Sequence, residues 1–403
     1  MQSGLVEAVL SRNSANVQVI ETAHAPAAWW AVASRFLLHG LIVSTWVSRI
    51  PTIKAALGLS NAAFGLTLLG TAVGSVAAVP LAGWLVARFG SKRLATWSAV
   101  GFSLALVAPS LSTGAFSLFV SLTLFGAMAG TNDVSINSQG AELEEALGTP
   151  TMSRFHAMFS IGGMIGASLG GLIAAGGVGP QAHLAGAAAV FLGIGLASAS
   201  HLPEAQRLHT GDLHSSPKRR MLSLPPVLLI LAVIGFFMFL SEGAIADWSG
   251  VYFRQALGAS AGIAAAGYAV FSAGMALFRL LGDAITSRLG HVRTLRGAAL
   301  VAAGGLSLAL TTHSIHWVLL GFGVTGAGLS VIVPLVFGAG GRIKSVASGT
   351  GIALVSGSGY IGFLFGPPLI GLVAQRGSLQ GALFILVALT LVTASLAPAV
   401  RPR

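Results

Sequence analysis

Twelve long apolar stretches limit the fold of this 403-residue chain more strongly than any other feature. A helix needs about 20 mostly apolar residues to cross the hydrocarbon core of a bilayer, and each stretch is close to that length or longer. Because the stretches do not alternate with period two, they predict helices rather than the strands of a membrane barrel. They cover 29–47, 62–86, 94–111, 115–138, 155–175, 183–201, 226–251, 262–286, 295–312, 315–339, 346–374 and 379–398.

The composition agrees with a chain that lies mostly in lipid. Hydrophobic residues make up 54% of the sequence and charged residues 8%, whereas a soluble domain carries roughly 25% charged residues. So few charges cannot cover a surface in water, which excludes a soluble or disordered protein. The chain has no cysteine, which excludes disulfides, thiolate metal sites and cysteine nucleophiles. We expect neither a metal nor a cofactor.

The distribution of Lys and Arg predicts the orientation of the helices. With both chain ends inside the cell, 16 of the 22 Lys and Arg residues fall in inner segments. The outer segments hold Arg49, Lys54, Arg254 and Arg376, and the spans hold Arg35 and Arg279. Cytoplasmic loops of membrane proteins carry such an excess of positive charge. We therefore expect both termini in the cytoplasm, and the net charge of +11 needs no nucleic-acid partner.

A polar interruption after the sixth span divides the chain into two halves. We expect a cytoplasmic tail over 1–28, a six-helix bundle over 29–201, a cytoplasmic linker over 202–225, a second six-helix bundle over 226–398 and a cytoplasmic tail over 399–403. The architecture predicted is an all-α integral membrane protein with twelve transmembrane helices.

The two halves repeat each other at an offset of 200 residues. Leu57-Gly58-Leu59-Ser60 recurs as Leu257-Gly258-Ala259-Ser260, and Arg88-Phe89-Gly90 recurs as Arg288-Leu289-Gly290. Two halves of six spans in the same orientation are related by a pseudo-two-fold axis along the membrane normal. Secondary transporters use this arrangement, with the substrate site between the halves near the bilayer midplane.

The loop after the second span resembles motif A of the major facilitator superfamily, Gly-x-x-x-Asp-Arg-x-Gly-Arg-Lys. It reads Gly83-Trp-Leu-Val-Ala87-Arg88-Phe-Gly90-Ser-Lys92-Arg93, so Ala87 stands where the family usually has the Asp that helps to lock the cytoplasmic gate. The second half offers a partial counterpart in Arg279, Asp283, Arg288 and Gly290. The resemblance covers about 29–398 and implies a carrier that works by alternating access.

Further stretches resemble bacterial permeases of the YbjJ-like type, which are similar to fucose permeases. They are Trp46-Val-Ser-Arg49-Ile-Pro51, Asn132-Asp133-Val-Ser-Ile-Asn137-Ser-Gln139, Phe155-His156 and Glu242-Gly-Ala-Ile-Ala-Asp247-Trp248. This resemblance implies proton-coupled uptake of a small polar solute, such as a sugar or polyol, across a bacterial inner membrane. We expect a monomer whose partners are the solute, protons and membrane lipid.

Charged residues inside the spans are candidates for transport chemistry, because they are costly in lipid. Asp133 lies in the cytoplasmic half of the fourth span and shares a helix face with Asn137, and Glu242 lies in the outer half of the seventh span. Each carboxylate is a candidate for binding the coupling proton or the solute. For Asp133 the alternative is an ion pair with Arg88 or Arg154 that closes the gate.

Other polar candidates have structural alternatives. Arg35 and His39 share a face of the first span; Arg35 needs a carboxylate, an anionic ligand or the interface, and His39 is a proton carrier or a neutral core residue. Interfacial solvation is the alternative for Asp247 and His156, and core packing for Tyr360. Asn132 and Gln139 complete the set of polar candidates.

Two structural expectations concern the helix ends. Arg279 and Asp283, four residues apart at the cytoplasmic end of the eighth span, are expected to pair with each other and to form part of the gate. Aromatic residues near the outer ends predict an interfacial belt. These are Trp46, Trp248, Tyr252 and Trp317.

Other classes of function are less favoured. The glycine run from Gly162 to Gly171 resembles motif C of drug/proton antiporters but has Ala167 in place of Pro, and the fourth span lacks the antiporter Arg. Proton-driven efflux of amphipathic drugs or metabolites therefore stays the alternative. A transporter-like sensor is less favoured, because the tail and linker are short. The sequence has no His-Glu-x-x-His, Gly-x-Ser-x-Gly or Walker motif, which argues against an enzyme or an ATP-driven pump.

Overall fold

The computed structural model describes residues 25–149, 151–203, 224–343, 346 and 348–402. Over these residues the regular structure is helical, and twelve segments are long and apolar enough to cross a membrane, as predicted. The predicted N-terminal tail falls outside the described residues up to position 24, as do 204–223 of the predicted linker.

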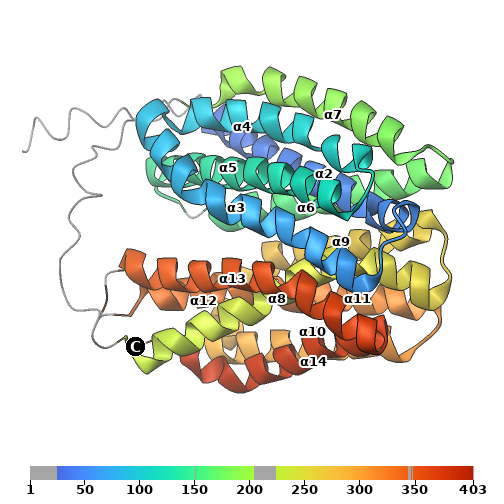
Figure 1. Cartoon of the computed structure of the whole chain (residues 1–403). Helices are drawn as coiled ribbons and strands as arrows, with labels where there is room; N and C mark the ends of the chain where they lie inside the picture. The colour runs from blue at the N-terminus through green and yellow to red at the C-terminus, as the bar shows by residue number, and fades with distance from the viewer. Residues whose placement is uncertain (1–24, 150, 204–223, 344–345, 347, 403) are drawn as a thin grey trace, which may run out of the picture.

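Six spans form each half of the molecule (Figure 1). The first half contains α2 (Ala25–Ala56), α3 (Asn61–Phe89), α4 (Ser91–Ala105), α5 (Ala115–Leu147), α6 (Met152–Ala175) and α7 (Pro180–Ala197). The second half contains α8 (Pro226–Leu257), α9 (Ala261–Leu289), α10 (His291–Thr311), α11 (Ile315–Leu329), α12 (Ile332–Gly341), α13 (Ser348–Arg376) and α14 (Leu379–Leu396). Short 3₁₀ helices follow α4, α7 and α14, at Ala108–Leu111, Ala199–His201 and Ala397–Val400.

Three helices are longer than the apolar pattern predicts. α2, α5 and α8 end at Ala56, Leu147 and Leu257, whereas their apolar stretches end near 47, 138 and 251. The added turns carry polar residues such as Arg49 and Glu142, which hydropathy does not count as part of a span. The backbone hydrogen bonds of a helix do not depend on side-chain hydropathy, so the helices continue past the apolar stretch.

The tenth span is broken between α11 and α12. Pro334 explains the break, because it has no N–H to donate and its ring clashes with the carbonyl group four residues earlier, that of Ser330. The turn also packs against α9: a Cβ atom at Gly282 would lie 2.9 Å from Cγ1 of Val331. The break therefore lies beside the helix that carries Arg279.

The internal repeat is visible in the backbone. Ser60 and Ser260 cap α3 and α9, and each side chain accepts a hydrogen bond from the backbone N–H three residues later. Gly90 and Gly290 have φ angles of 86° and 78°, in the region that favours glycine, and each ends one helix and begins the next. The repeated sequences therefore build the same turns in both halves.

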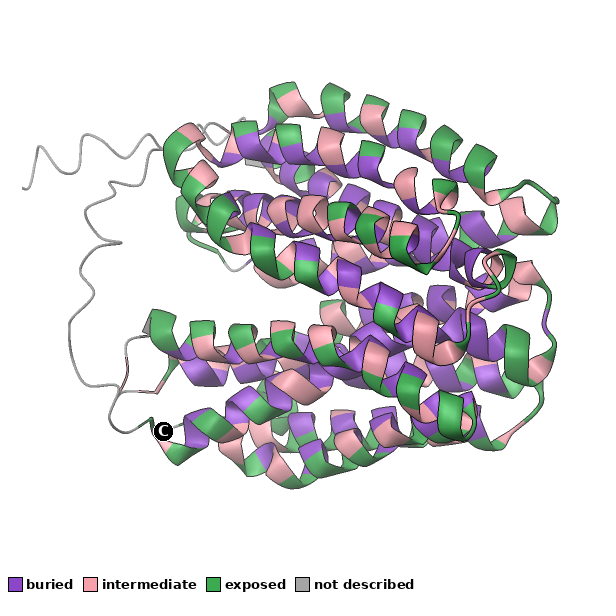
Figure 2. Cartoon of the chain, in the orientation of Figure 1, coloured by how far each residue is buried: buried purple, intermediate pink, exposed green. Residues whose placement is uncertain are grey.

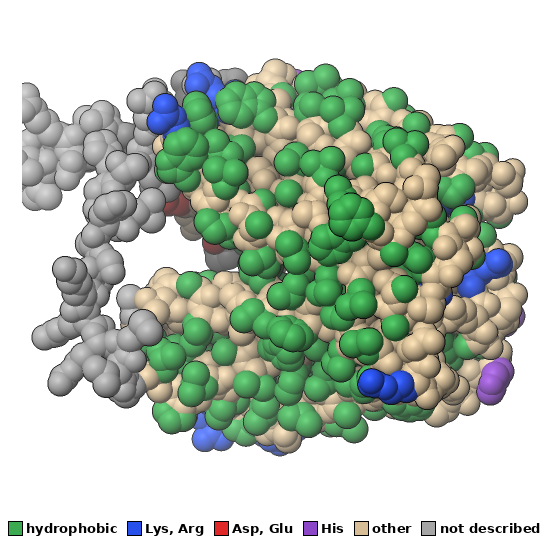
Figure 3. All heavy atoms as spheres, viewed as in Figure 1, with side chains coloured by type: hydrophobic (Ala, Val, Ile, Leu, Met, Phe, Trp, Pro, Cys, Tyr) green, Lys and Arg blue, Asp and Glu red, His purple; other side chains and the backbone are tan. Residues whose placement is uncertain are grey.

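The helices have buried faces and exposed faces. Figure 2 shows buried residues where helices meet and exposed residues on the outside of both halves. Large hydrophobic side chains remain on that outside, including Leu81, Leu104, Phe116 and Leu172, and they give the apolar surface in Figure 3. An apolar surface of this extent suits contact with lipid rather than with water.

Glycines hold the helices of each half close together. A Cβ atom at Gly126 of α5 would overlap the carbonyl oxygen of Thr71 in α3, and one at Gly326 of α11 would overlap that of Phe271 in α9. The two contacts occupy equivalent positions in the repeat. Small residues permit such close backbone approach in membrane bundles.

Gly126→Val and Gly326→Val are therefore expected to destabilise the fold. The added side chain meets backbone, which cannot rotate away, so we expect a cost on the order of 3 kcal/mol. Gly186→Val in α7 is the matched control, because a Cβ atom there has no neighbour within 4 Å. Thermal midpoints of the detergent-solubilised variants test this. Equal midpoints for all three would contradict the described packing.

The two halves meet at one end and diverge at the other. We call the end where α2 begins and α14 ends the terminal side. At the opposite side, a Cβ atom at Gly65 of α3 would lie 2.7 Å from the carbonyl oxygen of Pro367 in α13, and one at Gly171 of α6 would lie 2.9 Å from that of Gly262 in α9. At the terminal side Figure 3 shows a cleft between the halves, with acidic side chains visible in it.

Candidate functional site

Several predicted candidates lie near the middle of their helices. His39 is 14 residues from the start of α2, Asp133 is 14 residues from the end of α5, and Glu242 is 16 residues from the start of α8. At 1.5 Å per residue these positions are about 21–24 Å from the terminal side. Because α5 and α8 extend past their apolar stretches, Asp133 and Glu242 lie close to the middle of these helices.

Asp133 joins the two halves. Its Oδ2 atom accepts a hydrogen bond from the hydroxyl group of Tyr360 in α13 at 3.1 Å, and its Oδ1 atom accepts one from Nδ2 of Asn137 at 3.0 Å. Asn137 thus shares the face of Asp133, as its spacing predicts. No ion pair with Arg88 or Arg154 occurs in the described residues. Tyr360 is a partner of the carboxylate rather than a core residue.

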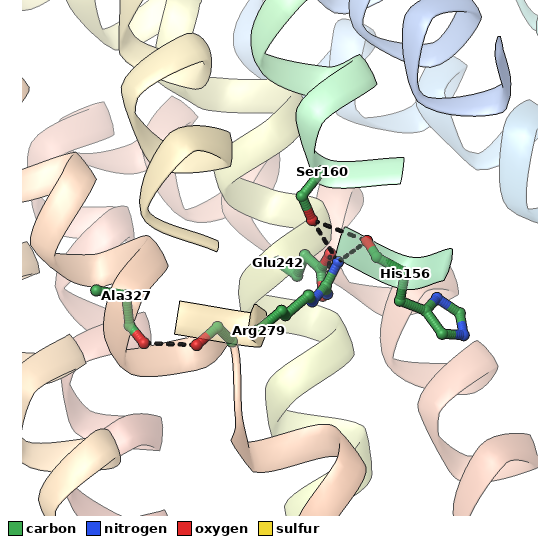
Figure 4. A network of polar contacts seen from close by, with 6 residues as sticks. His156, Ser160, Glu242, Arg279 and Ala327 are labelled. Carbon is green, nitrogen blue, oxygen red and sulfur yellow. Dashed lines mark hydrogen bonds and ion pairs between the residues drawn. The ribbon is translucent and has the colours of Figure 1, made fainter. Parts of the chain in front are cut away.

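Arg279 makes a second contact between the halves. Its guanidinium group donates from Nη1 to Oγ of Ser160 at 2.6 Å and to the carbonyl oxygen of His156 at 3.2 Å, both in α6. Its Nη2 atom lies 3.6 Å from Oε1 of Glu242 in α8. Figure 4 shows these groups converging on the guanidinium from two helices. The positive charge is thereby shared between a carboxylate of its own half and neutral acceptors of the other.

The expected pairing of Arg279 with Asp283 is wrong. Asp283 is exposed near the end of α9 and has no hydrogen-bond or ion-pair partner among the described residues. Ten residues separate Arg279 from the end of α9, so its long side chain extends into the interior rather than to the helix end. A spacing of four residues permits a pair, but the interior carboxylate of Glu242 is the one in reach.

His39 belongs to a hydrogen-bonded chain within the first half. Its Nδ1 atom lies 2.9 Å from Oδ1 of Asn132, and Nδ2 of Asn132 donates to Oγ of Ser98 at 3.0 Å. The imidazole ring also packs near Phe102 and Phe159, with centroid distances of 5.1 and 5.6 Å. Asn132 therefore orients His39 directly.

The side chains of Gln139 and His156 make no hydrogen bond to Asp133, Glu242 or Arg279 among the described residues. The amide of Gln139 donates to Ser91 and Glu142 near the terminal side, inside the first half. The ring of His156 packs edge-on against Phe36 with a centroid distance of 5.4 Å and points away from Arg279 (Figure 4). His156 thus contributes its carbonyl oxygen rather than its imidazole.

Arg35 and Asp247 are both left without protein partners. Arg35 is 2% exposed, and none of its three guanidinium nitrogens has a hydrogen-bond partner in the described part of the chain. Access to the interface, one expectation for Arg35, is therefore wrong. Asp247 is half-buried and makes no hydrogen bond or ion pair to the described residues. It shares a helix face with Gly250, which packs against Pro51 of the first half.

The motif A-like residues lie on the terminal side. Gly83, Arg88, Gly90, Lys92 and Arg93 fall where α3 ends and α4 begins, and Arg288 and Gly290 fall between α9 and α10. The guanidinium of Arg88 lies 5.4 Å from the ring centroid of Trp84 and 5.6 Å from that of Phe89. With Ala87 in place of Asp, an aromatic cluster rather than a carboxylate faces this cation.

Some residues near the opposite side are more buried than predicted. Trp248 is completely buried, and its ring meets Phe64 of α3 edge-on with a centroid distance of 5.6 Å. The expected aromatic belt is therefore wrong for Trp248 and for the equally buried Trp46 and Tyr252, and Trp317 is exposed as expected. Trp248 instead fills the contact between the halves.

Two partners of the polar contacts are not evident from the sequence pattern. Ser160 was not a candidate, although it is the repeat equivalent of Tyr360, and both residues reach across to the other half. Arg49, expected in an outer loop, is buried in α2, where its Nε atom donates to Nδ1 of His183 at 2.7 Å. The repeat offset of 200 was the signal that could have linked Ser160 to Tyr360.

The sequence profile of the Major Facilitator Superfamily matches residues 32–343. The chain belongs to this superfamily. It is a membrane transporter and not an enzyme, because the family and the similar proteins are transporters.

Similar proteins cover most of the chain. An uncharacterised transporter of the same superfamily from Yersinia pestis is 36% identical over 361 residues, which are 89% of this chain and 91% of the relative. An uncharacterised transporter of Sinorhizobium fredii is 32% identical over 93% of this chain and 98% of the relative. The membrane protein MosC of Rhizobium meliloti is 30% identical over 90% of this chain and 88% of the relative.

Solved structures share the fold. The nucleoside transporter NupG superposes with a TM-score of 0.69 at 13% identity, covering 93% of this chain and 98% of that one. A D-xylose–proton symporter superposes with a TM-score of 0.69 at 14% identity, covering 92% and 96%. The twelve-helix, two-bundle fold predicted from the repeat is confirmed.

Proposed function

We propose that this protein is a proton-coupled carrier that moves a small polar solute, such as a sugar or polyol, into a bacterial cell. The observation that carries the proposal is the hydrogen bond from Tyr360 to Asp133, which joins a mid-depth carboxylate of one bundle to the other bundle. A carboxylate accepts hydrogen bonds more strongly when ionised than when protonated. A proton on Asp133 would therefore weaken a contact that holds the bundles together.

Proton binding can drive transport only if it changes the balance between two conformations. Asp133 meets this condition, because its partner belongs to the other bundle. Glu242 has a different part in the proposal: it neutralises Arg279, which donates to Ser160 of the other bundle. We assign proton binding to Asp133 and charge balance to Glu242.

The orientation in the proposal places the terminal side in the cytoplasm. The charge count supports this, since 16 of the 22 Lys and Arg residues fall in the segments that the sequence predicts to be inside the cell. The cleft of Figure 3 would then open to the cytoplasm, in the state from which an uptake carrier releases solute. The similarity to a D-xylose–proton symporter agrees with the proposal, which rests on the residues of this chain.

Uptake into vesicles tests the proposal. The purified protein is reconstituted, a pH gradient that is acidic outside is imposed, and the radiolabelled sugars and polyols D-xylose, D-glucose, D-mannitol and myo-inositol are offered separately. We expect one of them to accumulate against its gradient and the accumulation to collapse with a protonophore. Accumulation of amphipathic cations under the opposite gradient would instead establish efflux.

Tyr360→Phe is expected to shift the conformational balance without unfolding the protein. The change removes the hydroxyl that donates to Asp133 and keeps the ring that packs near Phe239. A hydrogen bond to a charged group contributes about 1.5–3 kcal/mol, so the equilibrium between the two conformations should move about 10- to 100-fold. Because the native chain has no cysteine, labelling of a single cysteine introduced at Asn61 reports opening of the opposite side. An unchanged labelling rate would contradict the proposed contact.

A further inference from the structure

We propose that Nε2 of His39 accepts a hydrogen bond from a hydroxyl group of the transported solute. The inference rests on the proposed function, because it names the solute chemistry of the same site. It also differs from the expectation that His39 carries a proton. The hydrogen-bonded chain of Asn132, Ser98 and Ser135 behind the ring fixes the ring proton of His39 on Nδ1.

Counting hydrogens shows which group donates and which accepts in each hydrogen bond behind the ring. The hydroxyl of Ser135 donates to the backbone carbonyl oxygen of Asn132 at 2.8 Å, so its single hydrogen is used. The oxygen of Ser135 lies 3.1 Å from that of Ser98, and this bond therefore needs the hydrogen of Ser98. Ser98 can then only accept from the side-chain amide of Asn132, at 3.0 Å.

This direction decides the tautomer of His39. With its NH₂ group on Ser98, Asn132 turns its carbonyl oxygen toward Nδ1 of His39, and only an N–H on Nδ1 can satisfy that oxygen. With a flipped amide, Ser98 would donate to Asn132, and Ser135 could donate to Ser98 only by giving up its bond to the carbonyl oxygen of Asn132, so one hydrogen bond would be lost. Asn132, Ser98 and Ser135 are 3% exposed or less, so a missing hydrogen bond there is costly.

The other ring nitrogen is left as an acceptor. In a neutral imidazole with the proton on Nδ1, Nε2 carries a lone pair and no hydrogen. Nε2 makes no hydrogen bond to the described residues. Some unpaired polar atoms of these residues are completely enclosed by protein, such as those of Arg35 and Trp248, but Nε2 of His39 is not one of them. Nε2 is therefore not fully enclosed, although the His39 side chain as a whole is buried, and it lies at the same depth as the carboxylate of Asp133.

An accessible lone pair selects for hydrogen-bond donors. A hydroxyl group can donate a hydrogen bond to Nε2. The oxygen atoms of an ionised carboxylate or phosphate group carry no hydrogen, so they would repel the lone pair of Nε2. The unpaired carboxylate of Asp247, about 10 Å further from the terminal side along its helix, is an acceptor of the same preference. The two groups favour a solute with several hydroxyl groups and disfavour an anionic one.

The tautomer can be measured without any solute. Protein labelled with ¹⁵N-histidine is reconstituted in lipid, and the His39 signals among the 10 histidines are assigned by their loss in His39→Phe. We expect solid-state NMR at neutral pH to show hydrogen on Nδ1 and none on Nε2. A proton on Nε2, or on both nitrogens, would overturn the inference.

Binding tests the contact with the solute. Affinities for D-xylose, D-glucose, D-mannitol and myo-inositol are compared with those for analogues in which one hydroxyl is replaced by fluorine, which cannot donate. For one hydroxyl position we expect the native protein to prefer the parent compound about 3- to 10-fold. Ser98→Ala frees the amide of Asn132 and should remove that preference, as should His39→Phe.

Ser103→Ala is the matched control, because Ser103 is a buried serine of the same helix that bonds only within that helix, to the carbonyl oxygen of Ala99. It should keep the preference. Preference unchanged in Ser98→Ala and His39→Phe, or no binding of any of the four compounds, would overturn the inference. These measurements use equilibrium binding without a pH gradient. If the hydroxyl preference depends on His39 but no solute accumulates in response to a pH gradient, the proposed function alone is overturned. If a solute accumulates in response to the gradient but the preference does not depend on His39, this inference alone is overturned.

Discussion

Asp133→Asn is expected to abolish proton-driven accumulation of the solute while leaving exchange of solute across the membrane. Asn keeps the shape of the side chain and accepts from Tyr360 through its carbonyl oxygen, but it cannot bind a proton. With one proton per solute, a gradient of one pH unit supports about tenfold accumulation, since one unit corresponds to a factor of ten in proton activity. The variant should reach equal concentrations inside and outside.

Glu145→Gln is the control for Asp133→Asn. Glu145 is an exposed carboxylate near the end of the same helix, α5, and its side chain has no partner among the described residues. The control should keep the full accumulation and its dependence on the pH gradient. Tenfold accumulation by Asp133→Asn would show that the coupling proton binds elsewhere and would move the assignment to Glu242.

Arg279→Gln is expected to reduce both stability and transport. It leaves the carboxylate of Glu242 in the membrane interior without its ion pair and removes the strong donor to Ser160. Breaking a largely buried pair by removing one partner costs about 3 kcal/mol or more, so transport should fall on the order of 100-fold and the thermal midpoint should drop. Uptake rates and thermal midpoints of reconstituted protein measure the two effects.

A double-mutant cycle separates the ion pair from other effects of Arg279→Gln. In the Arg279→Gln, Glu242→Gln double variant no charge is left unpaired, so the thermal midpoint should recover most of its loss. Transport should stay low, because the charged donor to α6 is still missing. Arg293→Gln, at an exposed arginine of α10 without a hydrogen-bond or ion-pair partner among the described residues, should change neither quantity. Additive effects of the two substitutions would contradict the described pair.

The sequence predicts the fold well, because the fold depends on local composition and on the repeat. Apolar length gives the twelve spans, and the offset of 200 gives the two bundles. The helix ends were less predictable at Ala56, Leu147 and Leu257, where polar turns extend the helices. Asp133, counted from the extended end of α5, therefore lies closer to the middle of its helix than the apolar stretch indicates.

The contacts of the site were predictable only within a helix. The spacing of four residues correctly paired Asn137 with Asp133, but it wrongly paired Asp283 with Arg279. Partners from distant helices, such as Tyr360 for Asp133, depend on how the bundles pack, and no pattern within one helix contains that information. The sequence thus indicates which residues are costly in lipid but not which groups neutralise them.

The central claim is that solute and proton are coupled through Asp133. The most direct test measures proton exchange by the purified protein in a lightly buffered detergent solution when the transported solute is added. The account predicts a pH change in the native protein that saturates with the solute and is absent in Asp133→Asn. An equal pH change in Asp133→Asn, or binding of the solute with no pH change in the native protein, would contradict it.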